Sequence, residues 1–96
     1  MLVNVVGGEP VRIPPDHTLA VGRTATSDVP IFDKTVSRRH ALVGLTKRGV
    51  VVTDLGSRNG TYVNGNRVSS AVLARGDVVS FGKVAFRVDD IIRRST

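Results

Sequence analysis

Cysteine is absent from this 96-residue chain, and aromatic residues are few, with one tyrosine, three phenylalanines and no tryptophan. The missing cysteine excludes a disulfide framework, cysteine-ligated zinc and a cysteine nucleophile. No apolar stretch approaches the roughly 18 residues of a transmembrane helix, and the first residues lack the basic and apolar regions of a secretory signal. We therefore expect one small domain in the cytoplasm, alone or as the cytosolic part of a larger protein.

Signatures of catalysis are also missing. The two histidines, His17 and His40, do not have the close spacing of metal ligands, so we expect no metal and no cofactor. Ser37, His40 and Asp54 contain the residue types of a catalytic triad. There is, however, no Gly-x-Ser-x-Gly elbow, no Walker loop and no dinucleotide fingerprint. We interpret His40 as a hydrogen-bonded structural residue and do not expect an enzyme.

Acidic residues are outnumbered by basic ones, eight against fourteen, which gives a formal net charge of +6. Eleven of the basic residues are arginines, whose guanidinium groups bind phosphate or carboxylate through paired hydrogen bonds. This excess favours an anionic partner, which on composition alone can be a nucleic acid, an acidic membrane or a phosphoprotein. Nucleic acid is the weaker interpretation, because the arginines are scattered and no basic helix is expected to enter a groove.

Valine dominates what is present, with eighteen residues against six leucines and four isoleucines. β-Branched side chains favour strands, and ten glycines and four prolines interrupt the chain too often for long helices. The short apolar stretches predict an all-β sandwich or barrel of about eleven strands. The expected strands are residues 2–6, 11–13, 19–23, 29–32, 40–46, 50–54, 62–63, 67–68, 72–73, 78–81 and 84–88.

Three tight turns are specified by their residues. Asn64-Gly65 predicts a type I′ hairpin, because both central residues of that turn need positive φ. Gly82-Lys83 and Lys47-Arg48-Gly49 predict two further hairpins between valine-rich strands. With turns this frequent, we expect a meander in which consecutive strands pair as neighbours.

Three polar segments each combine an arginine with a nearby hydroxyl or amide: Gly22-Arg23, residues 35–40 and residues 56–61. A phosphate group carries about −1.5 to −2 charge near neutral pH, and its site needs arginine, hydroxyl and N–H donors at one point. Alternate loops of a β-sandwich meet at one end, which would bring these segments together. The same residue types also favour ordinary turns, so a purely structural interpretation stays open at this point.

The order and spacing of these motifs resemble the forkhead-associated (FHA) domain family. Gly22-Arg23 matches the family's Gly-Arg, and residues 37–40 match its Ser-x-x-His. Residues 54–65 match Asp-hydrophobic-x-Ser-x-Asn-Gly-Thr-x-hydrophobic-Asn-Gly. The resemblance implies an FHA-type two-sheet β-sandwich over residues 1–88 with its ligand loops at one end. Residues 89–96, with a possible helical turn around Ile91-Ile92, would be a C-terminal tail or the start of a linker.

The resemblance also implies roles for individual residues. Arg23 would bind the phosphate, and Ser37 would donate its hydroxyl proton to it. Three further residues would contact the phosphate or the peptide: Arg38, Arg58 and Asn59. Two would read the residues that flank the phosphothreonine: Thr35 and Lys83. The residues implied to be structural are Gly22, His40, Ser57, Gly60, Thr61, Asn64 and Gly65.

The function implied by the resemblance is phosphothreonine-dependent protein–protein interaction in Ser/Thr kinase signalling. The expected partner is a phosphothreonine-containing protein, either a kinase or its substrate, bound by a monomer without nucleic acid or membrane. Two alternatives stay open: a basic binder of nucleic acid or acidic surfaces, and an FHA-like scaffold that binds no ligand. The presence of Arg23, Ser37 and Asn59 together argues against the empty scaffold.

Overall fold

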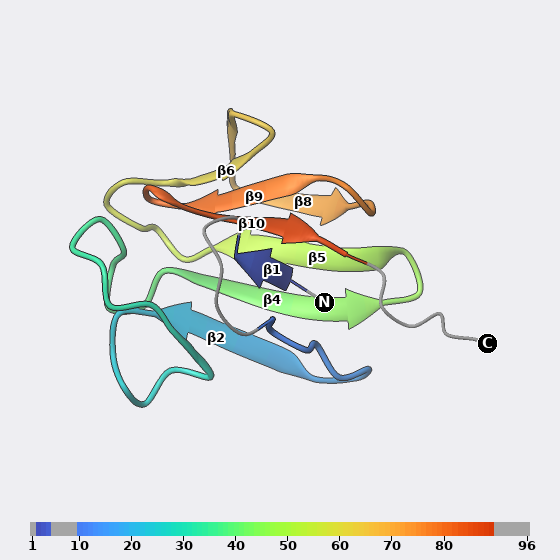
Figure 1. The fold of residues 1–96 in the computed structure, drawn as a ribbon, viewed down its shortest axis with the longest axis horizontal. Coiled ribbons are helices and arrows are strands. Elements are labelled where there is room, and N and C mark those ends of the chain that lie inside the picture. Colours follow the sequence, from blue (N-terminus) through green and yellow to red (C-terminus); the bar gives the residue numbers. More distant parts are fainter. Residues whose placement is uncertain (1, 5–9, 90–96) are drawn as a thin grey trace.

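Two five-stranded sheets pack face to face in the computed structural model, which describes residues 2–4 and 10–89 (Figure 1). One sheet has the order β1 (Leu2–Asn4), β10 (Val84–Val88), β9 (Val78–Phe81), β6 (Thr61–Val63) and β7 (Asn66–Val68). The other has the order β3 (Val29–Pro30), β2 (Thr18–Gly22), β4 (Ala41–Thr46), β5 (Gly49–Asp54) and β8 (Ser70–Leu73). The described ranges contain no helix, and thus none that could span a membrane. The predicted all-β sandwich is confirmed.

The core lies between the sheets and follows from the alternation of side chains along the strands. Strand β4 buries Ala41 and Val43, and β5 buries Val50 and Val52, with a less buried residue between the two in each strand. Strands β9 and β10 show the same alternation. These side chains belong to one apolar cluster: Leu2, Ile13, Val21, Val29, Ile31, Val36, Ala41, Val43, Val50, Val52, Leu73, Val79, Phe81, Phe86 and Val88. A shared core of this kind holds the strand ends, and the loops that leave them, in fixed positions.

The three predicted hairpins are present. Asn64 and Gly65 have φ values of 50° and 86°, as the type I′ turn between β6 and β7 requires. Phe81 pairs with Val84 across the β9–β10 turn, and β4 and β5 are joined through the pairing of Thr46 with Gly49. Local turn chemistry therefore sets the register of these strand pairs.

The expected meander is wrong. Strands β2 and β4, β5 and β8, β6 and β9, and β1 and β10 pair although they are not consecutive, and β3 lies parallel to β2. The chain passes from one sheet to the other after β1, after β5, after β7 and after β8, because both inner faces must be supplied with apolar residues. The described ranges contain ten strands rather than about eleven. Residues 11–13 form only a bridge between Val11 and Leu2, with Ile13 in the core.

The loops after β2, between β3 and β4, and between β5 and β6 gather at one end of the sandwich, beside the β9–β10 hairpin (Figure 1). The β4–β5 hairpin lies at the opposite end. The prediction that the candidate ligand loops share one end is thus confirmed. The predicted helical turn around Ile91-Ile92, and the tail from residue 90 onward, lie outside the described residues.

Candidate phosphate-binding site

An open cavity of about 240 Å³ lies among the three loops. All five residues predicted to contact a phosphopeptide line it, together with two that the sequence did not single out. The lining residues are Arg23, Lys34, Val36, Ser37, Arg38, Arg58 and Asn59. Four of these side chains are cationic and none is acidic, so the electrostatic potential of the cavity attracts anions. The roles of the five residues in ligand binding stay predictions.

Arg23 is the first residue after β2, and its position is fixed by backbone contacts rather than by its side chain. Its N–H donates to the Ser37 carbonyl oxygen at 3.1 Å. The preceding residue, Gly22, passes so close to the next loop that a Cβ there would lie 2.0 Å from the Arg38 carbonyl oxygen. Glycine is therefore required at position 22 for Arg23 and Arg38 to reach the same cavity.

The Ser37 hydroxyl is oriented by the neighbouring loop. Its oxygen accepts a hydrogen bond from the Arg58 backbone N–H at 3.0 Å. Because that oxygen already accepts, the hydroxyl proton is left to be donated to another group. The arrangement provides an O–H donor at the cavity wall and uses the Arg58 N–H to hold it, while the Arg58 side chain itself lines the cavity.

Asn59 connects the same two loops from the other side. Its side-chain amide N–H donates to the Thr35 carbonyl oxygen at 2.8 Å. An asparagine amide has a second N–H and a carbonyl oxygen, and within the described residues no hydrogen bond occupies either one. Both remain available to the backbone of an extended peptide.

His40 joins these loops from inside the fold and is completely buried. Its Nδ1 accepts from the Ser37 N–H at 3.0 Å, which requires the ring hydrogen to be on Nε2, and Nε2 donates to the Gly60 carbonyl oxygen at 2.9 Å. The ring lies edge-on to Phe81, with centroids 5.8 Å apart. His40 thus holds the Ser37 and Gly60 loops at a fixed separation, with no contribution to the cavity wall itself.

Asp54 organises the loop that carries Arg58 and Asn59. One carboxylate oxygen accepts from the hydroxyls of Ser57 (2.6 Å) and Thr61 (2.7 Å), and the other accepts from the N–H groups of Gly56 and Ser57 at 3.0 Å. Burial raises the pKa of the Asp54 carboxyl, but the hydrogen bonds from Ser57, Thr61 and Gly56 outweigh that effect and leave the pKa below its ordinary value. The carboxylate is therefore the charged centre of a preformed turn.

A model of the FHA domain matches residues 19–82. The chain belongs to the forkhead-associated family. FHA domains are phosphothreonine-dependent interaction modules that act in Ser/Thr kinase signalling.

Curated relatives and solved structures agree with this assignment. The glycogen accumulation regulator GarA of Mycolicibacterium smegmatis is 53% identical over 66 residues, which are 69% of this chain and 42% of GarA. The chain thus spans less than half the length of that relative. Among solved structures, the FHA domain of FhaA in complex with the intracellular domain of Rv3910 superposes with a TM-score of 0.81 and 29% identity, covering 90% of this chain and 94% of that one. Mycobacterium tuberculosis EmbR bound to a low-affinity phosphopeptide gives a TM-score of 0.82 and 28% identity, over 99% of this chain and 24% of EmbR.

Thr35 and Lys83, the two predicted specificity residues of this FHA domain, lie together at the edge of the site. The Thr35 hydroxyl donates to the Asp33 carboxylate and accepts from the Lys83 N–H at 3.0 Å. The bond from Thr35 also holds the pKa of the Asp33 carboxyl below its usual value, with help from the Thr35 N–H. Through these contacts Thr35 connects its loop to the β9–β10 hairpin. The Lys83 side chain is exposed and can contact a ligand.

Two of the residues predicted to be structural lie away from the cavity. Asn64 and Gly65 form the β6–β7 turn, and the Asn64 side chain accepts from the Val78 N–H at 2.9 Å and donates to Asp77 at 3.1 Å. Lys34, in contrast, lines the cavity and was not predicted. The only sequence signal for Lys34 was its position directly before Thr35, in the same loop as Ser37. A single lysine that belongs to no motif does not predict a binding residue.

Proposed function

We propose that this FHA domain binds phosphothreonine-containing segments of partner proteins through the cavity between its three loops. The observation that carries the proposal is the convergence of four cationic side chains, one oriented hydroxyl and one asparagine amide on a single open cavity with no acidic lining residue. A doubly charged phosphate matches this set of donors, whereas a neutral peptide leaves the cations without a counter-charge.

Each lining residue has a distinct part in the proposed complex. The Arg23 guanidinium, based on the rigid end of β2, binds two phosphate oxygens as a fork. Ser37 donates its hydroxyl proton, because Arg58 N–H occupies the oxygen as acceptor. Lys34, Arg38 and Arg58 add positive charge around the remaining oxygen. Asn59 pairs with the peptide backbone next to the phosphothreonine, and its bond to Thr35 fixes its orientation.

The proposed partners are a Ser/Thr kinase or its phosphorylated substrates, bound by a monomer that catalyses no reaction itself. The complex of the FhaA FHA domain with an intracellular domain and the phosphopeptide complex of EmbR support this class of partner. Protein kinases use cytoplasmic ATP, so we also propose a cytoplasmic location. Neither nucleic acid nor membrane is needed for this mode of binding.

The direct test is calorimetric titration with one peptide in three forms, carrying phosphothreonine, phosphoserine or threonine. We expect binding of the phosphothreonine form and none of the unmodified form. Arg23→Ala should cost about 2–5 kcal/mol of binding free energy, at least about a thirtyfold loss of affinity, because a charged partner is left unpaired. Arg48→Ala, on the β4–β5 hairpin at the opposite end, removes the same charge and should bind normally.

Equal affinity for the phosphorylated and unmodified peptides would reject the proposal. So would an Arg23→Ala variant that folds and binds like the wild type. Binding of any polyanion, with a steep dependence on salt and no dependence on threonine phosphorylation, would instead identify the basic nucleic-acid or acidic-surface binder.

A further inference from the structure

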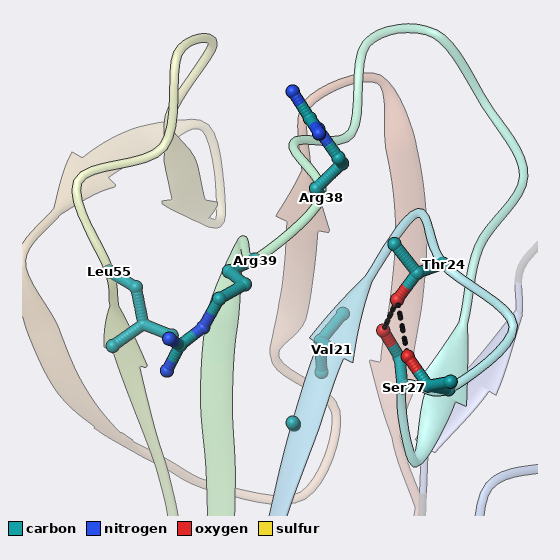
Figure 2. Close-up of a pocket in the computed structure, with 8 residues that line it drawn as sticks. Val21, Thr24, Ser27, Arg38, Arg39 and Leu55 are labelled. Carbon is teal, nitrogen blue, oxygen red and sulfur yellow. Dashed lines mark hydrogen bonds between the residues drawn. The ribbon is translucent and has the colours of Figure 1, made fainter.

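A second cavity, of about 190 Å³, lies at the loop end of the molecule, and Figure 2 shows the residues that line it. Its lining residues are Ala20, Val21, Thr24, Thr26, Ser27, Arg38, Arg39 and Leu55. Arg38 belongs to the walls of both cavities, so the two are neighbours across one residue. A peptide that places a phosphorylated residue in the first cavity therefore brings the neighbouring residues of the peptide near the second cavity. Nothing in the proposed function uses this second space.

The second cavity combines an apolar floor with a polar, cationic rim. Ala20, Val21 and Leu55 supply the apolar part, Arg39 supplies a guanidinium group, and no acidic residue lines the space. The Arg38 side chain points away from these residues (Figure 2). Figure 2 shows Arg39 extended over the start of β4 toward Leu55, with Thr24 and Ser27 on the other side of Val21. The opposite wall of the cavity is therefore made of hydroxyl groups.

That hydroxyl wall is preorganised. The Thr24 hydroxyl is 2.9 Å from the Ser27 hydroxyl and 3.2 Å from the Thr26 hydroxyl, and the Ser27 N–H donates to the Thr24 carbonyl oxygen at 3.1 Å. The turn also packs on Gly22, where a Cβ would lie 2.9 Å from the Ser27 Oγ. Each hydroxyl can rotate to donate toward an incoming group without a change in the backbone.

Within the described residues, the Arg39 side chain forms neither an ion pair nor a hydrogen bond. The Asp28 carboxylate accepts from the N–H of the lining residue Ala20 at 2.8 Å and does not itself line the cavity. The Arg39 guanidinium is thus a cation beside an apolar floor with five N–H donors left for a ligand.

We propose that this cavity is a subsite for a second anionic side chain of the same ligand, in a residue that flanks the phosphothreonine. Glutamate or a second phosphorylated residue fits it, because each has a hydrocarbon part that can contact the apolar floor and a negative group that can bind Arg39. The inference rests on the proposed function, since the first phosphate brings the flanking residues into reach. Arg39 is then a specificity-determining residue.

The test compares phosphothreonine peptides in which each flanking position in turn carries glutamine, glutamate or a second phosphothreonine. We expect one position at which an anion raises the affinity of the wild type by about three- to tenfold over glutamine. In Arg39→Gln this gain should disappear, while the affinity for the glutamine peptide stays the same. Arg48→Gln is the matched control, because it removes an equal charge at the far end of the molecule and should keep the gain.

The outcomes separate this inference from the function on which it rests. If the wild type binds the glutamine peptide but gains nothing from an anion at any position, the subsite is rejected and phosphothreonine binding stands. If Arg39→Gln keeps the gain, or Arg48→Gln loses it equally, the effect is general electrostatics and the subsite is again rejected. If no phosphorylated peptide binds, both proposals fail. Preference for glutamate or for the second phosphate identifies the source of the anion.

Discussion

At the scale of single residues, His40 determines the relative position of two ligand loops from a place that no ligand can reach. Its ring is fully buried and bonds to Ser37 on one loop and Gly60 on the other. The sequence predicted a structural histidine at this position, because no catalytic partner motif accompanied it. The same reasoning could not supply its two hydrogen-bond partners, which are three and twenty residues away and meet it only through the fold.

Truncation of this ring should cost stability rather than direct phosphate contact. His40→Ala leaves a cavity beside Phe81 and removes the acceptor of the half-buried Ser37 N–H, so we expect a loss of about 3 kcal/mol in the free energy of unfolding. Urea denaturation measures this loss. His17→Ala, at an exposed histidine, is the control and should change stability by less than about 0.5 kcal/mol. A His40→Ala variant as stable as the control would show that the ring does not support the loops.

Asp54 is the second residue on which the loops depend, and its effect should vary with pH. Asp54→Asn replaces one of two accepting oxygens by an N–H₂ group that faces donors, and we expect a cost of about 1–3 kcal/mol at neutral pH. The pKa of the native carboxyl is lowered, so the charged form stabilises the fold. That stabilisation is complete above the unfolded pKa of about 3.9 and is lost as the pH falls through the lower native value.

Denaturation curves measured from neutral to acid pH check this prediction. The stability difference between the wild type and Asp54→Asn should shrink as the solution is acidified. The same change at Asp16, an exposed turn residue whose φ of 62° asparagine also tolerates, should show little difference at any pH. A wild-type advantage that persists unchanged in acid would contradict the assigned role of the charged carboxylate.

At the scale of elements, the sequence predicts hairpins well and sheet order poorly. Asn64 and Gly65 alone specify the β6–β7 turn, because the turn needs positive φ at both positions and these residue types tolerate it. The pairing of β6 with β9, or of β5 with β8, depends on which face of each strand reaches the shared core, and no local signal encodes that choice. The loops were placed at one end correctly because that follows from the sandwich architecture, whereas the entry of Lys34 into the cavity follows from the path of one particular loop.

A substitution at Gly22 tests how the end of β2 positions the site. A Cβ at position 22 would lie 2.0 Å from the Arg38 carbonyl oxygen, so Gly22→Ala must displace the loop that carries Ser37 and Arg38. We expect a loss of about 1–3 kcal/mol in stability and weaker phosphopeptide binding at temperatures where the variant is folded. Calorimetry of folding and of binding measures both.

Gly76→Ala separates this effect from ordinary backbone strain. Gly76 has a φ of 95° but nothing within 4 Å of a Cβ, and it lies outside both cavities. The variant should lose about 1 kcal/mol of stability through strain alone and keep its affinity. If Gly22→Ala bound as tightly as Gly76→Ala, close packing at position 22 would not be what aligns Arg23 with Arg38.

At the scale of the whole molecule, only some of the charges behind the net charge of +6 lie at the candidate site. Arg23, Lys34, Arg38 and Arg58 surround one cavity, whereas Arg48 lies on the far hairpin. Screening limits electrostatic interaction between exposed charges to about 10 Å at 0.1 M salt, so the far charges contribute little to a ligand at the loops. Composition therefore indicates an anionic ligand, and only the fold shows which arginines can act together.

The most direct test of the central claim is an NMR titration of the isotope-labelled chain with a phosphothreonine peptide and its unphosphorylated form. We predict that the phosphorylated peptide shifts the backbone amide signals of Arg23, Ser37 and Arg58, which lie in three separate loops. The signals of the β4–β5 hairpin should not move, and the unphosphorylated peptide should shift none of them. Shifts confined to that far hairpin, or equal shifts with both peptides, would contradict a phosphate site at the loop end.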